Sequence, residues 1–196
     1  IKKKIKGIIS NNYFIDIGLR KNLLLAKKTL ELEIKKPAIF FDRDGVINYD
    51  YGYTYKIKNF IFKPGILNKL NKIGKKRFYI FIVTNQAGIG HGIFSEKQFF
   101  VLHKNLKKVL FKKNILINDV KFCPFHKSAI VKKYKKNSKY RKPGNLMIEN
   151  LKKNWNINVK NSVMIGDKIS DEKCAIKSNI KFYYVNKKFD LLKENL

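Results

Sequence analysis

The stretch AIFFDRDGVIN, residues 38–48, decides the fold of this chain. Its first four residues form a short apolar run that is typical of a buried strand, and the run stops at Asp42. Asp44 follows two residues later, so both carboxylates can point to one side at the strand end. Gly45 then lets the chain turn sharply away. The stretch predicts a buried strand with two carboxylates at its carboxyl end, and a plain strand-to-turn Asp-Gly is the alternative.

Short apolar runs alternate with amphipathic stretches along the rest of the chain. The other predicted strands are 79–83, 120–123, 162–165 and 182–185. The predicted helices are about 64–73, 95–111, 146–155 and 171–178. Ser95 with Gln98 three residues later resembles a capping box, and the lysine-rich stretch 126–141 is predicted to be a solvated loop. This alternation favours an α/β fold, a doubly wound, Rossmann-like parallel sheet with crossover helices.

The composition is that of a globular protein, with 44% hydrophobic residues over 196 positions. No apolar run approaches the roughly 18 residues that a membrane span needs. No stretch has the pattern of a secretory signal. The two cysteines, Cys123 and Cys174, are too few for a disulfide framework, so a reducing, cytoplasmic location is expected.

The formal net charge of +30 has two interpretations. One is a surface selected to bind nucleic acid or another polyanion. The other is compositional drift, because lysine is spread through every segment and arginine, the better phosphate ligand, occurs only four times. We favour drift and expect no membrane partner. In either case the positive field attracts anionic substrates, most strongly at low salt.

Three further motifs follow predicted strands or precede a predicted helix. Thr84 to Gly90 places a hydroxyl, amides and glycines where they can donate hydrogen bonds to phosphate oxygens. Arg141 and Lys142 precede the helix near 146 and can neutralise a developing phosphoryl charge. Asp167 ends a strand after Gly166, where it can complete a site of oxygen ligands for Mg²⁺. All four motifs fall at the carboxyl ends of strands, where doubly wound sheets bind ligands.

Taken in order, the motifs resemble the series of the haloacid dehalogenase (HAD) superfamily: Asp-x-Asp, Thr, Lys and Gly-Asp. Residues 37–187 are similar to its capless heptose 1,7-bisphosphate 7-phosphatases, through 42–48, 50–53, 84–89, 141–143 and 166–168. The resemblance implies Asp42 as nucleophile, Asp44 as general acid and base, and Thr84 and Lys142 as stabilisers of the phosphoryl group. It implies Mg²⁺ held by Asp42, the backbone carbonyl of Asp44, and Asp167. The substrate-contacting residues that it implies are Asp50, Tyr51, Gly52, Tyr53, Asn85, Gln86, Ala87, Arg141 and Lys168.

Many members of that family carry a zinc site near the third motif. This chain keeps Cys123, but Phe125 stands at the position of the histidine, with His126 adjacent. Ser138 and Tyr140 stand at the positions of the paired cysteines. One thiolate and one displaced imidazole cannot complete a tetrahedral site, so zinc is predicted to be absent.

Residues 1–35 precede a unit, 36–196, that is complete without them. Residues 13–18, with a helix predicted at 23–34, resemble the C-terminal end of sugar-phosphate nucleotidyltransferases. The resemblance implies a fusion to, or cooperation with, such an enzyme, and an incidental helical extension is the alternative.

Four functions remain open at this stage. The first is a phosphatase acting on a small sugar phosphate, with the heptose bisphosphate preferred. The second is a histidinol-phosphate phosphatase, and the third is a polynucleotide 3′-phosphatase, which the charge favours. The fourth is a basic nucleic-acid-binding protein on an inactive HAD scaffold, against which the complete set of motif residues speaks.

Overall fold

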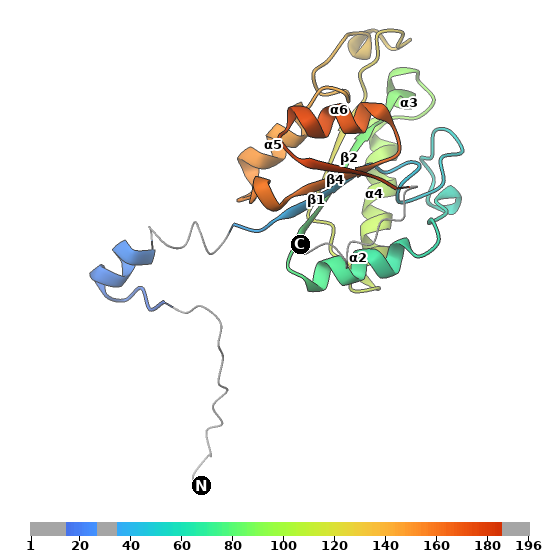
Figure 1. The fold of residues 1–196 in the computed structure, drawn as a ribbon. Coiled ribbons are helices and arrows are strands. Elements are labelled where there is room, and N and C mark those ends of the chain that lie inside the picture. The colour runs from blue at the N-terminus through green and yellow to red at the C-terminus, as the bar shows by residue number, and fades with distance from the viewer. Residues whose placement is uncertain (1–14, 27–34, 186–196) are drawn as a thin grey trace. The chain divides into compact units, whose positions relative to one another are not determined.

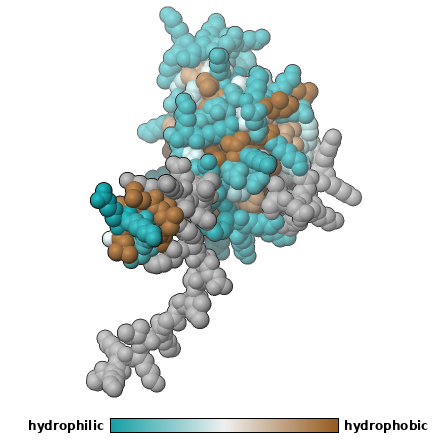
Figure 2. All heavy atoms as spheres, turned by 60° about the vertical axis from the view of Figure 1, so that its left-hand side comes forward, coloured by the Kyte–Doolittle hydropathy of each residue, from teal (hydrophilic) through white to brown (hydrophobic). Residues whose placement is uncertain are grey.

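The computed structural model describes residues 15–26 and 35–185, and the chain divides into two compact units, Ile1–Lys35 and Lys36–Leu196. In the first unit residues 20–26 are helical, so this helix begins earlier than the predicted 23; the predicted residues 27–34 lie outside the described part. Leu19 and Leu24 are 64% and 56% exposed, and brown side chains mark this segment in Figure 2.

The second unit is built around one parallel sheet of five strands in the order β3-β2-β1-β4-β5 (Figure 1). The strands are β1 (Ala38–Phe41), β2 (Tyr79–Asn85), β3 (Asp119–Cys123), β4 (Val163–Gly166) and β5 (Lys181–Tyr184). The helices are α2 (Ile66–Lys75), α3 (Ala87–Gly90), α4 (Glu96–Phe111), α5 (Leu146–Asn154) and α6 (Ile169–Lys177). Three short 3-10 helices complete it: η1 (Ile57–Asn59), η2 (Lys132–Tyr134) and η3 (Val159–Asn161). The predicted α/β parallel sheet is confirmed.

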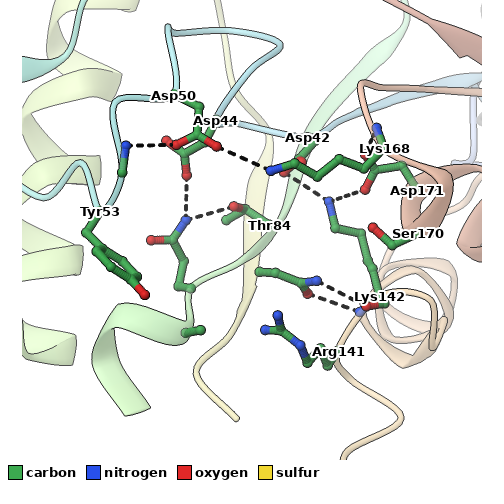
Figure 3. Close-up of a pocket in the computed structure, with 14 residues that line it drawn as sticks. Asp42, Asp44, Asp50, Tyr53, Thr84, Arg141, Lys142, Lys168, Ser170 and Asp171 are labelled. Carbon is green, nitrogen blue, oxygen red and sulfur yellow. Dashed lines mark hydrogen bonds and ion pairs between the residues drawn. The ribbon is translucent and has the colours of Figure 1, made fainter. Parts of the chain in front are cut away.

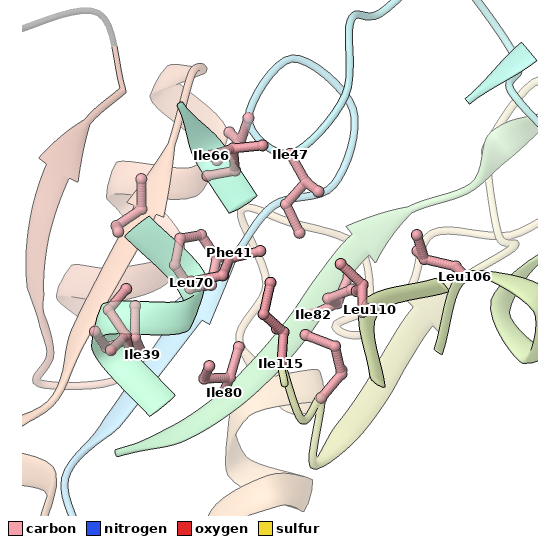
Figure 4. Close-up of a cluster of buried hydrophobic side chains, with 14 of the residues drawn as sticks. Ile39, Phe41, Ile47, Ile66, Leu70, Ile80, Ile82, Leu106, Leu110 and Ile115 are labelled. Atoms are coloured by element: carbon pink, nitrogen blue, oxygen red, sulfur yellow. The ribbon is translucent and has the colours of Figure 1, made fainter. Parts of the chain in front are cut away.

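Both faces of β1 are buried, which explains its unbroken apolar sequence. Ile39 and Phe41 point into one core, which helices α2 and α4 cover (Figure 4). Phe40 points into the other core, which helices α5 and α6 cover. The strand order reverses at β1, since β2 lies on one side of it and β4 on the other. Such a reversal opens a crevice at the carboxyl ends of the strands, directly after Phe41.

Several predicted boundaries needed correction. Helix α2 begins at Ile66 rather than Pro64, because Gly65 precedes it with φ +74°. Helix α6 begins at Ile169, two residues before the predicted Asp171. The capping box of Ser95 and Gln98 is confirmed, with Ser95 Oγ accepting from the Gln98 amide at 3.2 Å.

The stretch 126–141 is not simply a solvated loop. It contains η2, and Ala129 and Tyr134 are buried against Phe94 and Phe99. The rest of the surface shown in Figure 2 is largely hydrophilic. Within residues 15–26 and 35–185, no helix has the length and apolar character that crossing a membrane requires.

Candidate active site

A cavity of about 490 Å³ lies at the carboxyl ends of the strands (Figure 3). Loops after β1, β2 and β4 and the segment before α5 supply its walls. Its lining residues are Asp42, Asp44, Asp50, Gly52, Tyr53, Thr84, Asn85, Gln86, Ala87, Arg141, Lys142, Lys168, Ser170 and Asp171. The structure thus brings the four motifs of the sequence together in one crevice.

Lys142 lies at the bottom of this cavity between two carboxylates. Its Nζ is 2.9 Å from Asp42 Oδ1 and 2.7 Å from Asp171 Oδ1. The Lys142 side chain is 1% exposed and that of Asp171 is fully buried, so these ion pairs are shielded from water. A buried cation held beside the first carboxylate of an Asp-x-Asp motif can neutralise negative charge that arrives on a ligand there.

Burial and these charges shift the pKa values in the crevice. Burial raises the pKa of Asp42 to about 6, although Lys142 opposes the shift. Burial alone would lower the pKa of Lys142, but the carboxylates of Asp42 and Asp171 outweigh it and raise that pKa. Lys142 is therefore a cation at neutral pH, and Asp42 is mostly ionised there.

Asp171 is the main site residue that the sequence analysis did not assign. Its Oδ2 accepts hydrogen bonds from the backbone amides of Asp167 and Lys168 at 3.2 and 3.1 Å. It thus caps the first turn of α6 while its Oδ1 pairs with Lys142. Gly166 makes this possible, because a Cβ at that position would overlap the Asp171 side chain.

The Asp44 carboxylate accepts hydrogen bonds from a set of side-chain donors. The buried Arg43 guanidinium contacts it through Nε and through Nη2, the latter at 2.7 Å from Oδ2. Asn48 Nδ2 and Gln86 Nε2 each donate to it at 2.9 Å. The two carboxylates that leave β1 therefore occupy different environments, which suits different chemical roles.

Two residues predicted to contact substrate line the cavity and also bond other site residues. Both ends of the Asn85 amide bond the backbone of Lys142, at 3.0 and 3.1 Å. Gln86 Nε2 donates to Thr84 Oγ1 at 2.8 Å as well as to Asp44. Asn85 fixes the position of Lys142, and Gln86 orients Thr84 and Asp44. The Thr84 side chain is 1% exposed at the cavity wall.

Of the remaining residues predicted to contact substrate, all except Tyr51 line the cavity. Lys168 Nζ pairs with Asp50 Oδ2 at 3.2 Å. Arg141 Nη1 is buried and has no hydrogen-bond partner among the described residues, so it is available to an anion. Tyr51 is not among the lining residues; its ring is 69% exposed and stacks on Tyr49 at 5.8 Å.

Carboxylates near Asp42 fit a divalent cation. Asp42, Asp167 and Asp171 each offer an oxygen, and these atoms lie within 4.8 Å of one another. Asp167 Oδ1 is buried and has no hydrogen-bond partner within the described ranges. A bare buried oxygen of this kind is costly, and a hard cation such as Mg²⁺ relieves the cost. Asp171 already bonds two amides and Lys142, so Asp42 and Asp167 are the better candidates for side-chain ligands.

The absence of zinc near the third motif stays a prediction, and the surroundings of Cys123 and His126 agree with it. Cys123 is buried, and burial raises the pKa of its thiol, which keeps the sulfur protonated. His126 uses Nδ1 to bond Ser128 Oγ at 2.7 Å. Among residues 15–26 and 35–185, neither Cys123 nor His126 belongs to a cluster of three potential metal ligands.

Comparison with known proteins agrees with this site. Residues 37–190 match the family model described as polynucleotide kinase 3 phosphatase, so the chain is a member of that family. The D-glycero-beta-D-manno-heptose-1,7-bisphosphate 7-phosphatase of Rhodopseudomonas palustris is 38% identical over 141 residues, 72% of this chain and 78% of the relative. The chain belongs to the HAD-like heptose-bisphosphate phosphatase family.

Other relatives support the same family. The D-glycero-alpha-D-manno-heptose-1,7-bisphosphate 7-phosphatase of Burkholderia mallei is 39% identical over 138 residues, 70% of this chain and 73% of the relative. The D,D-heptose 1,7-bisphosphate phosphatase of B. bronchiseptica, solved with magnesium and phosphate, has the same fold. Its TM-score is 0.67 at 21% identity, over 76% of this chain and 79% of that one. Family members of both anomeric names match about equally well, so the match does not choose between the anomers.

Proposed function

We propose that this chain is a Mg²⁺-dependent phosphatase that removes the C7 phosphate of D-glycero-D-manno-heptose 1,7-bisphosphate. The observation that carries the proposal is the position of Lys142, 2.9 Å from Asp42 and 2.7 Å from Asp171. A phosphoryl group placed against Asp42 would meet this buried cation and the hydroxyl of Thr84. The names of the relatives support the choice of substrate.

In the first step an Asp42 carboxylate oxygen attacks the C7 phosphorus, and the bond between phosphorus and the C7 oxygen breaks. Asp44 gives its proton to the departing alkoxide, which leaves as the C7 hydroxyl. The product on the protein is an aspartyl phosphate. Lys142 and Thr84 stabilise the charge on the transferring group, and Asp171 and Asn85 hold Lys142 in place.

In the second step water attacks the phosphorus of the aspartyl phosphate. Asp44, now a carboxylate, takes a proton from that water, and inorganic phosphate leaves while Asp42 is regenerated. When bound, Mg²⁺ would screen the charges of Asp42 and the phosphoryl oxygens. Asp42, Asp167 and the backbone carbonyl of Asp44 are the ligands that we propose for it.

Arg141 and Lys168 would bind the rest of the substrate. Arg141 presents a buried, unpartnered nitrogen, and its forked guanidinium suits a second phosphate. Lys168 would exchange its contact with Asp50 for a substrate oxygen. We propose these two cations as the reason for preferring a bisphosphate over a monophosphate.

The test is phosphate release with Mg²⁺ from heptose 1,7-bisphosphate, histidinol phosphate and a 3′-phosphorylated oligonucleotide. We expect the heptose bisphosphate to give the highest kcat/KM, and the Asp42→Asn variant to lose at least about a thousandfold on every substrate. Asp119→Asn is the matched control, since Asp119 pairs with Lys121 rather than with a site residue. Release from none of the three, with Asp42→Asn equal to the wild type, would overturn the enzymatic assignment.

A second candidate rests on the family model. Its description is polynucleotide kinase 3 phosphatase, and it covers residues 37–190. The charge of +30 would favour a nucleic-acid substrate at low salt. A higher kcat/KM on the 3′-phosphorylated oligonucleotide, falling steeply with salt, would support this candidate over the heptose.

We further propose that residues 1–35 are the tail of a sugar-phosphate nucleotidyltransferase unit and that the protein works in the cytoplasm. The sequence of residues 13–18 and the exposed Leu19 and Leu24 support the first point. Two free, buried cysteines support the second. A reading frame without transferase-like sequence upstream would reject the fusion.

A further inference from the structure

Helix α4 buries a histidine that has no place in the mechanism above. His103 is 5% exposed and packs against Phe99, one helical turn earlier, with ring centroids 4.2 Å apart and ring planes tilted by 41°. Phe99 and His103 are both among the buried residues of α4, so both rings lie on the buried face of the helix. His103 lies 60 positions from Arg43 in the sequence, yet its Nε2 is 3.3 Å from Arg43 Nη1.

Arg43 is the link between this histidine and the catalytic Asp44. Its side chain is fully buried, and its Nε and Nη2 contact the Asp44 carboxylate. Nη2 also donates to the Thr54 carbonyl at 2.9 Å and to Gln86 Oε1 at 3.1 Å. Within the described residues, the one hydrogen-bond partner of Nη1 is His103. Four groups therefore fix the guanidinium plane, and His103 contacts Nη1, the nitrogen that does not contact Asp44.

The protonation of His103 matches this contact. Burial, followed by the nearby charges of Arg43 and Lys107, lowers its pKa to about 3. The neutral ring can accept at Nε2, and its proton then sits on Nδ1. Nδ1 is buried and has no hydrogen-bond partner in the described part of the chain, which is destabilising. An apolar side chain at this position would avoid that cost, so packing alone does not explain a histidine here.

We propose that His103 is a positioning residue that orients the Arg43 guanidinium and, through it, the Asp44 carboxylate. This inference rests on the proposed role of Asp44 as the acid that protonates the leaving group. Without an acceptor at position 103, Nη1 would be a buried, unpaired donor. The guanidinium would then rotate towards another acceptor, and Asp44 would lose its alignment with the departing oxygen.

The experiment compares two kinds of leaving group. An alkoxide needs the proton from Asp44, whereas the phenolate of p-nitrophenyl phosphate leaves without it. We expect His103→Leu to lower kcat/KM by about tenfold on an alkyl phosphate and by less than about threefold on the aryl phosphate. His103→Asn, which is too short to reach Nη1, should show the same selectivity if His103→Leu does not fold. His103→Gln keeps an acceptor and should stay within about threefold of the wild type on both substrates.

The control is Leu102→Ala, which removes a buried neighbour on the same helix without touching the acceptor. It should lower the Tm but leave the ratio of the two kcat/KM values unchanged. Equal losses on both substrates in His103→Leu and His103→Asn, or no loss in either, would overturn the proposal, as would His103→Gln behaving like His103→Leu. Any alkyl phosphate that the wild type hydrolyses serves, so failure of the heptose assignment does not decide this test.

Discussion

Gly45 lies directly against the carboxylate of Asp167, and a Cβ at Gly45 would overlap that carboxylate. Gly45 also has a φ of +84°, a backbone conformation that residues with a Cβ rarely adopt. The turn at Gly45, in the first motif, therefore packs against the side chain of Asp167, in the fourth motif. Because Asp167 is a proposed ligand of Mg²⁺, the glycine serves the site as well as the turn.

Gly45→Ala should therefore displace Asp167 and weaken metal-dependent catalysis. A ligand moved by about 1 Å can cost about a hundredfold in kcat. The measurement is kcat as a function of Mg²⁺ concentration, and we expect both a lower plateau and weaker activation by the metal.

Gly65→Ala is the matched control for backbone strain. Gly65 has a φ of +74° but no atom within 4 Å of the added Cβ. Both variants should lose about 1–2 kcal/mol of folding free energy from the strained conformation. Only Gly45→Ala should change the response to Mg²⁺, and an equal change in Gly65→Ala would attribute the effect to stability alone.

Removing the charge of Lys142 should destabilise the protein at neutral pH. Lys142→Met leaves Asp42 and Asp171 as buried carboxylates without their cation, which typically costs about 3–5 kcal/mol. The measurement is chemical denaturation without metal. Asp171→Asn added to Lys142→Met removes one of the two stranded charges and should recover part of the loss. If the losses of folding free energy from Lys142→Met and Asp171→Asn simply added in the double variant, the ion pair would not be the cause of the destabilisation.

Much of the fold could be predicted because its signals are local. Strand β1 was placed at 38–41 from four consecutive apolar residues, and the sheet buries both its faces. Helix α4 was placed from the Ser95 capping box and ends at the predicted Phe111. Two predicted helix starts were wrong. Helix α2 begins after Gly65, and helix α6 begins two residues before its capping residue Asp171.

The site was predicted to the extent that its residues lie at strand ends. Asp171 was missed because an acidic residue early in a helix is ordinarily only a cap, and its second contact, with Lys142, joins distant segments. Gly166 was the available signal, since the absence of a Cβ there makes room for the Asp171 carboxylate. Nothing local in the sequence could reveal that Arg43 reaches His103, because helical periodicity places this histidine on a core face.

The pH dependence of kcat/KM should reflect the buried nucleophile. The pKa of Asp42 is raised to about 6 by burial, and the attacking form is the carboxylate. Activity should therefore fall as the pH decreases through about 6 when Mg²⁺ is limiting. A bound cation favours the ionised carboxylate, so saturating Mg²⁺ should move the acid limb to lower pH. The measurement is kcat/KM against pH at limiting and at saturating Mg²⁺. If the acid limb lay at the same pH under both conditions, the placement of the metal at Asp42 would be contradicted.

The third-motif loop should keep its structure without zinc. Tyr134 is buried, and its hydroxyl donates to Glu96 Oε1 at 2.7 Å. The Tyr134 carbonyl accepts from the His126 amide at 3.1 Å, and Lys136 Nζ lies 4.2 Å from the centre of the Phe125 ring. We expect the purified protein to hold well under about 0.1 zinc per chain and a chelator to leave its Tm unchanged. Metal analysis by mass spectrometry and thermal unfolding with a chelator check this.

Variants at Tyr134 test whether this buried side chain, rather than a zinc ion, stabilises the third-motif loop. Tyr134→Ala removes the buried ring and should cost about 3–5 kcal/mol of folding free energy. Tyr134→Phe keeps the ring but removes the hydroxyl that donates to Glu96, and it should cost about 1 kcal/mol. If the Tyr134 ring stabilises this loop, Tyr134→Ala must lose more folding free energy than Tyr134→Phe. Stoichiometric zinc, or a Tm that falls with chelator while Tyr134→Ala is neutral, would show that a metal still holds it.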